Sequence, residues 1–275
     1  MPEVQAHAER LTETFAGAAL QRFTPMTFTA LKTASPAPEV AKGQPLLEVG
    51  RRGKHLLLHF APATFVVHLM QGGRLKVDQK QAAKPRGGQA RWRFEDGRAL
   101  LLTEAGTERR AGVWVVSGDP SAQEPLDHLG PEADQIDRPT LATLLAEHPM
   151  RLHGWLRDQR ILAGLGRRLA NEICHRAKLS PFASTAKLDE PAVDRLGTAI
   201  GACMAESLKV ERTRSDMSSS KERPGAVHHR EGQACPVCGD TVRAVEYRSY
   251  TVNYCPTCQT DGRILADNTT SKFLK

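Results

Sequence analysis

The sequence lacks the features that a membrane or secreted protein needs. No apolar run approaches the roughly 20 residues that span a bilayer. The N-terminus, MPEVQAHAERL, is charged and amphipathic and contains no signal-peptide core. We therefore expect a cytoplasmic protein, in which the six cysteines are thiols or metal ligands and not disulfides.

The chain also lacks an excess of acidic residues. Lys and Arg together number 38 against 31 Asp and Glu, which gives a net charge of +7 and an isoelectric point near 9.2. This balance favours a polyanionic partner. The charged fraction of 25% argues against global disorder, and the hydrophobic fraction of 40% allows a sizeable core in two domains.

The spacing of apolar residues changes along the chain. Val4, Ala8, Leu11 and Phe15 recur at helical spacing, whereas residues 45–117 form short β-rich runs separated by turn residues. Helical periods return over 139–209, and the polar 212–225 stretch is expected to be mobile. We predict an α+β chain with five parts: an antiparallel β-sandwich packed by an N-terminal helix (1–120), a linker (121–138), a helical domain (139–230), a β-hairpin finger (231–261) and a tail (262–275).

Two CxxC pairs predict a metal site near the C-terminus. Cys235 and Cys238 are followed, after sixteen intervening residues, by Cys255 and Cys258. Four thiolates at this spacing fit one tetrahedral zinc ion, and they leave no open position for a substrate water. The zinc is therefore expected to be structural, with a redox dithiol pair as the alternative. Cys174 and Cys203 lie on helical segments and are expected to be core thiols.

Pro2 directly follows the initiator methionine. Removal of Met1 would leave a secondary amine at the chain terminus, and an α-amino group has a pKa of about 8. Part of such an amine is neutral at physiological pH and can attack a carbon such as the C1′ of a nucleotide. Glu3 stands next to it and could shuttle protons.

These features together resemble the formamidopyrimidine-DNA glycosylase / endonuclease VIII family, in a divergent, actinobacterial-type branch. The resemblance is carried by the Pro2–Glu3 start and by four later motifs. These are VGRRGKHLLLHF (49–60), HLMQGGRL (68–75), LRDQRILAGLGRRLANEICHRAKLSPF (156–182), and the finger with its approach VHHREGQACPVCG. The resemblance implies that residues 139–230 contain a helix–two-turn–helix that binds DNA.

The family's functional residues carry over position by position. The resemblance implies that Pro2 is the nucleophile, that Glu3 assists it and that Lys54 approaches the phosphates beside the lesion. Arg167 stands where the family has a phosphate-binding asparagine, and Arg248 is the candidate for the finger's phosphate-binding arginine. The three residues that fill the gap left by a flipped base align with Gln71, Arg109 and Ala111.

The implied activity is that of a DNA glycosylase with AP lyase activity. Such an enzyme excises a damaged base through a Schiff base on the proline and cleaves the strand by β,δ-elimination. The altered gap-filling residues leave three interpretations open: an enzyme for bulky, alkylated or crosslinked bases, an enzyme for abasic sites or single strands, and a non-catalytic paralogue that binds damaged DNA by shape. In each case the partner is DNA in the bacterial nucleoid, the protein is a monomer, and no small-molecule cofactor is needed.

Overall fold

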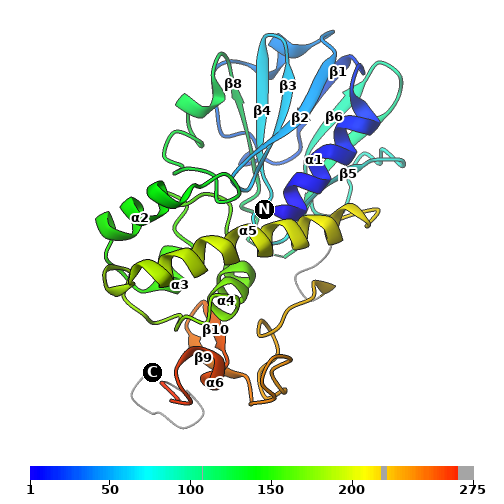
Figure 1. Cartoon of the computed structure of the whole chain (residues 1–275). Coiled ribbons are helices and arrows are strands. Elements are labelled where there is room, and N and C mark those ends of the chain that lie inside the picture. The colour runs from blue at the N-terminus through cyan, green and yellow to red at the C-terminus, as the bar shows by residue number, and fades with distance from the viewer. Residues whose placement is uncertain (107, 218–221, 266–275) are drawn as a thin grey trace. The chain divides into compact units, whose positions relative to one another are not determined.

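The computed structural model describes residues 1–106, 108–217 and 222–265, and the chain forms two compact units (Figure 1). One unit contains residues 3–128, and the other contains residues 129–275 together with Met1 and Pro2. Most of the predicted tail, residues 266–275, lies outside the described residues. Among the helices that the structure describes, none combines the length and the apolar character that crossing a bilayer requires.

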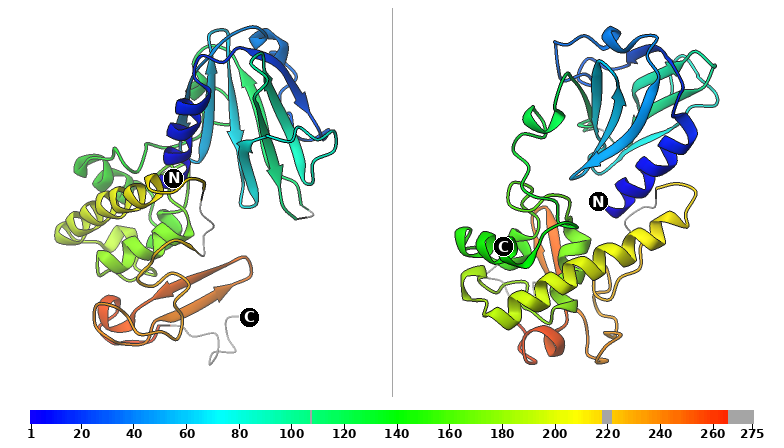
Figure 2. Two further views of the ribbon diagram at one scale, coloured as in Figure 1. Left: turned by 90° about the vertical axis from the view of Figure 1, so that its right-hand side faces the viewer. Right: turned by 45° about the horizontal axis from the view of Figure 1, so that its top comes forward.

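The unit of residues 3–128 is a sandwich of two four-stranded antiparallel sheets, as the short β-rich runs of the sequence predict (Figure 2). One sheet has the order β1-β6-β7-β5 and the other β2-β3-β4-β8. The first sheet contains β1 Leu20–Pro25, β5 Gly73–Val77, β6 Gly88–Phe94 and β7 Ala99–Glu104. The second contains β2 Leu46–Arg52, β3 His55–Phe60, β4 Ala63–His68 and β8 Gly112–Val116.

The first helix, α1 (Pro2–Phe15), packs on both sheets. Its Phe15 ring lies 5.0 Å from the ring of Phe94 on β6, and the hydroxyl of Thr12 accepts a 2.8 Å hydrogen bond from the amide of Val49 on β2. Short 3-10 turns, η1 (Pro38–Ala41) and η2 (Pro120–Ala122), complete this unit. The predicted helix-on-sheet arrangement is confirmed.

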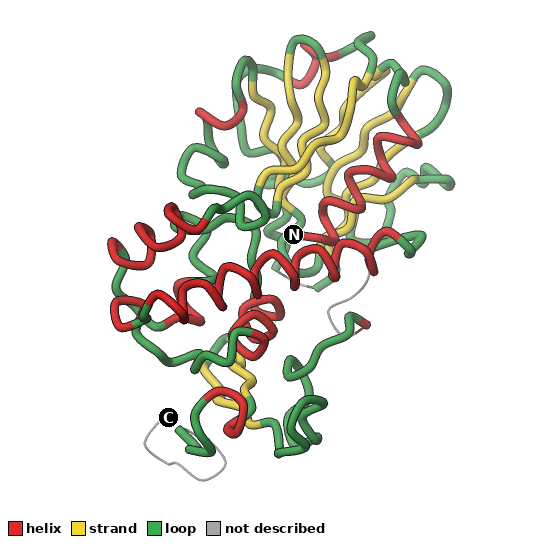
Figure 3. The backbone as a smooth tube through the Cα atoms, in the orientation of Figure 1, coloured by secondary structure: helices red, strands yellow, loops and turns green. Residues whose placement is uncertain are grey.

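The second unit consists of helices followed by a β-hairpin (Figure 3). Aspartates cap two of the helices: Asp137 accepts from the amide of Thr140, and Asp189 accepts from that of Ala192. The buried core of the helices includes Trp155 and Leu196, both fully enclosed. The elements are α2 Arg138–Glu147, α3 Leu152–Trp155, α4 Arg167–Arg176, η3 Thr185–Lys187, α5 Glu190–Arg212, β9 Arg243–Tyr247, β10 Tyr250–Tyr254 and α6 Pro256–Gln259.

Candidate nucleic-acid interface and metal centre

Gln159 shapes the two turns that lead into α4. Its side-chain amide donates hydrogen bonds to the carbonyls of Arg157 and Leu165, at 2.7 and 3.0 Å, and accepts one from the amide of Gly164 at 2.9 Å. Gly164 has a φ of +101°, which only glycine adopts without strain. One glutamine and one glycine therefore fix the path of the chain before the helix.

The N-terminus of α4 carries no side-chain cap. The helix has Gly166 as its N-cap residue, and the amide of Ala170 donates to the Gly166 carbonyl. The N–H groups of a helix's first turn lack partners within the helix and together carry about half a positive charge. This end of α4 is therefore suited to a phosphate group.

Two arginines and two tyrosines form an arginine–tyrosine cluster beside this helix end: Arg157, Arg167, Tyr247 and Tyr250. The guanidinium carbon of Arg157 lies 4.0 Å from the centroid of the Tyr250 ring, and that of Arg167 lies 6.0 Å from it. The Tyr247 ring stacks on Tyr250 at 4.7 Å and 13°. The cluster thus joins the two turns before α4 to the β9–β10 hairpin.

Among residues 1–106, 108–217 and 222–265, the two guanidinium groups of the cluster have no acidic partner. In the part of the chain that the structure describes, neither Arg157 nor Arg167 forms an ion pair with a carboxylate. Burial lowers the pKa of Arg157, the charge of Arg167 lowers it further, and Tyr250 offsets part of this effect. Two like charges that are partly withdrawn from water would be stabilised by an anion between them.

Buried polar side chains lie next to the arginine–tyrosine cluster. The imidazole of His153 stacks on Tyr250 at 5.9 Å and 14°, and burial lowers its pKa to about 3, so it is neutral. Asn171 on α4 donates to the Nδ1 atom of His228 at 2.9 Å, and Asn253 on β10 accepts from the amide of His229 at 3.2 Å. The His153 imidazole therefore adds no positive charge to that of the two arginines.

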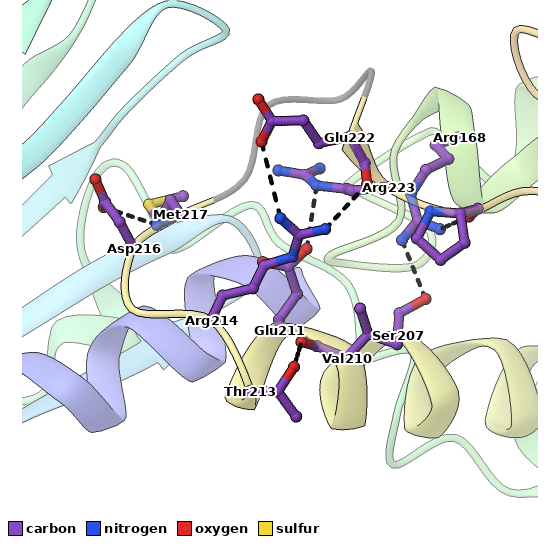
Figure 4. Close-up of polar contacts among 11 residues, drawn as sticks. Arg168, Ser207, Val210, Glu211, Thr213, Arg214, Asp216, Met217, Glu222 and Arg223 are labelled. Carbon is purple, nitrogen blue, oxygen red and sulfur yellow. Dashed lines mark hydrogen bonds and ion pairs between the residues drawn. The ribbon is translucent and has the colours of Figure 1, made fainter.

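Arg168, the residue after Arg167, has a structural role. It is 9% exposed, and its guanidinium donates to the hydroxyl of Ser207 on α5 at 3.0 Å and to the carbonyl of Pro224 at 3.4 Å (Figure 4). Nearby, Arg223 pairs with Glu211 at 3.4 Å. These contacts hold Arg223 and Pro224 at one end of the 212–225 stretch; residues 218–221, on which its predicted mobility partly falls, lie outside the described residues.

The four cysteines of the finger lie together. The Sγ atoms of Cys238 and Cys255 are 3.3 Å apart, and those of Cys235 and Cys258 are 3.9 Å apart. Four sulfurs at about 2.3 Å from a tetrahedral zinc ion are separated by about 3.8 Å. The donor set therefore fits a zinc ion held by thiolates, and this C-terminal cluster could bind a metal.

The loops around the cysteines are held by their own hydrogen bonds. The amide of Gly239 donates to the Cys235 carbonyl at 2.9 Å, and the carboxylate of Asp240 accepts from the Thr257 hydroxyl at 2.8 Å. These bonds connect the first CxxC loop to the second. Both pairs of cysteines are thus placed by the backbone turns that surround them.

Met1 and Pro2 belong to the unit that contains α4. Pro2 is buried at the first position of α1, and its nitrogen is an amide as long as Met1 is present. The Met1 side chain is 3% exposed and occupies the space that a side chain at position 164 would need, which is available because residue 164 is glycine. Removal of Met1 would therefore free both the Pro2 nitrogen and the space beside Gly164.

Glu3 and Lys54 belong to the other unit. Glu3 is half-buried in the first turn of α1. Lys54 is half-buried in the two-residue turn between β2 and β3, where Gly53 has a φ of +56°. Burial lowers the pKa of neighbouring His55 to about 3 and that of His68 to about 4, and the Lys54 charge contributes to both shifts. With both imidazoles neutral, the positive charge at this turn comes from Lys54 and from Arg51 and Arg52 just before it.

The positions aligned with the gap-filling residues differ in exposure. Gln71 and Arg109 are exposed on loops after β4 and β7. Ala111 is 1% exposed and its amide donates to the Glu104 carboxylate at 2.7 Å, so its side chain is buried within the unit of residues 3–128. Met70, which precedes Gln71, is 42% exposed with a φ of +52°. Met70 is thus an apolar side chain available on the same loop.

Arg248, the candidate for the finger's phosphate-binding arginine, lies at the tip of the β9–β10 hairpin. It is exposed in the two-residue turn between Tyr247 and Tyr250. Tyr250, not Arg248, lies with Arg157 and Arg167. All three tyrosines of the chain, 247, 250 and 254, lie in this hairpin.

Comparison with known proteins places these features in a family. The model of the formamidopyrimidine-DNA glycosylase N-terminal domain matches residues 1–114, and that of the formamidopyrimidine-DNA glycosylase H2TH domain matches residues 128–219. The chain belongs to the formamidopyrimidine-DNA glycosylase family. The formamidopyrimidine-DNA glycosylase of Teredinibacter turnerae is 31% identical over 79% of this chain and 83% of that protein. An uncharacterized formamidopyrimidine-DNA glycosylase-like protein of Mycobacterium tuberculosis is 39% identical over 54% of this chain and 94% of its own length.

Solved structures of this family share the fold. The Lactococcus lactis Fpg protein in complex with DNA containing an abasic site superimposes with a TM-score of 0.83 at 19% identity. The match covers 94% of this chain and 99% of that one. The predicted order of sandwich, helix–two-turn–helix and C-terminal hairpin is therefore confirmed at the level of fold.

Proposed function

We propose that this chain is a DNA glycosylase with AP lyase activity that acts on damaged DNA through Pro2. The observation that carries the proposal is Pro2 at the second position of a chain that matches both family domains. The solved relative bound to DNA with an abasic site supports DNA as the partner. Borohydride trapping of a covalent complex on abasic DNA tests the proposal, and a purely shape-reading DNA binder would give no such complex.

In the proposed reaction, the Pro2 nitrogen attacks C1′ of the damaged nucleotide. The C1′–N bond breaks, and the base leaves with the bonding electrons and takes up a proton. The C1′–O4′ bond then breaks, O4′ takes up a proton, and the opened sugar is held on Pro2 as an iminium ion. The resulting iminium ion acidifies the C2′ proton, which Glu3 removes, and the C3′–O bond then breaks with loss of the 3′ phosphate. A second elimination breaks the C5′–O bond, and water hydrolyses the imine to release the enzyme.

The arginine–tyrosine cluster is proposed to bind the DNA backbone. Arg157 and Arg167 have no acidic partners within the described part of the chain and lie beside the uncapped N-terminus of α4. Together they offer two cations and first-turn N–H groups to one phosphate. Arg248 at the hairpin tip and Arg109 on its exposed loop are proposed as further contacts, with Lys54 at the phosphates near the lesion. These contacts fix position along the duplex and carry no sequence information.

Zinc is proposed as the metal of the finger, held by Cys235, Cys238, Cys255 and Cys258. With all four positions taken by thiolates, its contribution is structural: it closes a segment too small to form a core of its own. The hairpin that it stabilises carries Tyr247 and Tyr250 of the arginine–tyrosine cluster. The metal therefore acts on DNA binding through the placement of the hairpin.

The Arg167→Ala variant is expected to bind DNA more weakly and with a smaller salt dependence. Each phosphate contact contributes about 0.9 to the slope of log K against log salt concentration, so this variant should lose about 1. The Arg157→Ala variant should behave in the same way. Fluorescence anisotropy with a labelled abasic-site analogue at several salt concentrations measures both slopes.

Arg160→Ala provides the matched control for this experiment. Arg160 lies in the same turns, but it is exposed and pairs with Asp158 at 2.8 Å. For the Arg160→Ala variant, the slope of log K against log salt concentration should equal that of the native protein. Equal slopes for the native protein and the Arg167→Ala variant would show that Arg167 does not contact a phosphate.

The exposed loop residues favour lesions whose stacking is already disrupted. Gln71 fills a gap in the base stack poorly, Ala111 is buried, and unstacking a base costs a few kcal/mol. We therefore expect slow excision of 8-oxoguanine opposite cytosine and fast incision at an abasic site by the same preparation. Single-turnover kinetics on the two duplexes measure the difference. Comparable rates would contradict the argument and would point to Met70 as the residue that fills the gap.

A further inference from the structure

The last turn of α4 brings a histidine to the cysteine cluster. His175 is 5% exposed, and its Nε2 atom lies 3.3 Å from the Sγ atom of Cys235, which is itself 2% exposed. The His175 nitrogen and the sulfurs of Cys235, Cys255 and Cys258 all lie within 4.8 Å of one another. Five candidate donors thus surround a centre that takes four.

The four cysteines complete a tetrahedral set, which leaves His175 outside it. A neutral imidazole carries one N–H group, and at 3.3 Å this group is placed to donate to a thiolate. Groups that donate to a metal ligand fix its orientation and influence how tightly the metal is held. A hydrogen bond to a charged sulfur is also stronger than one between neutral groups.

We infer that His175 is a positioning residue of the metal centre, donating its Nε2–H to the Cys235 thiolate and thereby coupling α4 to the finger. The inference depends on the proposed zinc ion. The same helix begins at Arg167 and ends at Arg176, so it extends from the arginine–tyrosine cluster to the metal centre. The hydrogen bond sets the position of the first CxxC loop relative to α4, the helix whose N-terminus is proposed to bind a phosphate.

Two other contacts join α4 to this region without touching a sulfur atom. The carboxylate of Glu172 accepts from the amides of Ala226, Val227 and His228, at 2.7, 3.1 and 2.8 Å. The side chain of Gln259 donates to the carbonyl of Leu179, just after the helix, at 2.9 Å. These contacts hold the finger against α4 in any His175 variant. Loss of the imidazole should therefore weaken the retention of the metal while the fold of the unit stays intact.

The test compares zinc release by the native protein and by His175→Phe and His175→Gln variants. A chelator that changes colour on binding zinc gives the rate. His175→Phe removes the donor and should release zinc about 10-fold faster, whereas His175→Gln keeps an N–H group and should stay within about threefold of the native rate. His148→Gln, at an exposed histidine of the same unit, is the control and should leave the rate unchanged.

Cobalt substitution reports on the sulfur atoms directly. Without the hydrogen bond the Cys235 thiolate is more electron-rich, so the thiolate-to-cobalt absorption band of His175→Phe should move to lower energy. A release rate within twofold of the native one would overturn the inference. Ligand-field bands that show a nitrogen ligand in the native protein and its loss in His175→Phe would also overturn it, because His175 would then bind the metal itself.

Two further results would also decide whether the inference and the proposed metal are correct. If the His175→Phe variant does not fold, the His175→Asn variant replaces it, because the asparagine amide is too short to reach the sulfur. Equal rates of zinc release from the His175→Asn and His175→Gln variants would then overturn the inference. Native protein that binds neither zinc nor cobalt would contradict the proposed metal, and trapping on abasic DNA would still test the proposed chemistry separately.

Discussion

Extension of the N-terminus by an uncleavable Gly-Ser dipeptide ahead of Pro2 is expected to abolish borohydride trapping on abasic DNA. The extension converts the Pro2 nitrogen into an amide, whose lone pair is delocalised and cannot attack C1′. Strand incision at an abasic site should fall by a factor on the order of 10³ or more, as for the loss of a catalytic nucleophile. Single-turnover gel assays with and without borohydride measure both effects.

The control carries the same dipeptide after Lys275 and should trap and incise like the native protein. Pro2→Gly provides a graded comparison, because glycine leaves a primary amine at the same place and should trap weakly. Mass spectrometry of the purified native protein should show that Met1 has been removed. Undiminished trapping by the N-terminally extended protein would exclude Pro2 as the nucleophile.

Replacement of Cys255 by alanine is expected to remove the metal and with it most of the affinity for DNA. The sulfur of Cys255 is fully buried and lies 3.3 Å from that of Cys238, so three ligands cannot enclose the ion in the same way. Bound zinc should fall from one equivalent to none. Affinity for abasic-site DNA should fall on the order of 100-fold, because β9 and β10 no longer hold Tyr250 against Arg157.

Cys203→Ala is the matched control for the loss of the metal. Cys203 is buried on α5 and does not belong to the group of described residues that could hold the metal. This variant should retain one equivalent of zinc and native affinity. The Cys255→Ala variant should keep the helical circular dichroism signal of α2, α4 and α5. If it keeps its zinc as well, the four-cysteine site is wrong.

The sequence was sufficient to predict the fold because periodicity and spacing are local properties. The β-rich runs of 45–117 cover β2 to β8 of the two sheets, whereas β1 lies before them and was not predicted; the helical periods predicted α2, α4 and α5. The two CxxC pairs predicted a cluster of sulfurs that the structure places together. In each case the signal lies within a few tens of residues and follows from the geometry of one element.

The arginine–tyrosine cluster could not be predicted in the same way. Arg157 and Tyr250 are far apart in sequence, and nothing in the local pattern around Arg157 shows that its guanidinium lies on a tyrosine ring. Arg248 was the natural candidate because arginine binds phosphate, yet the register of the hairpin places Tyr250 in the cluster and Arg248 at the tip. The burial of Ala111 depends on a tertiary contact with Glu104, which sequence alignment cannot show.

The confinement of every tyrosine to the β9–β10 hairpin gives the finger a spectroscopic label of its own. Protein grown with 3-fluorotyrosine would show three fluorine resonances, all from this hairpin and none from the β-sandwich. Tyr254 is fully buried and would serve as an internal reference, whereas Tyr247 and Tyr250 are partly exposed beside the arginines. Titrations with DNA or a chelator could then be followed at the hairpin alone, in an otherwise native protein.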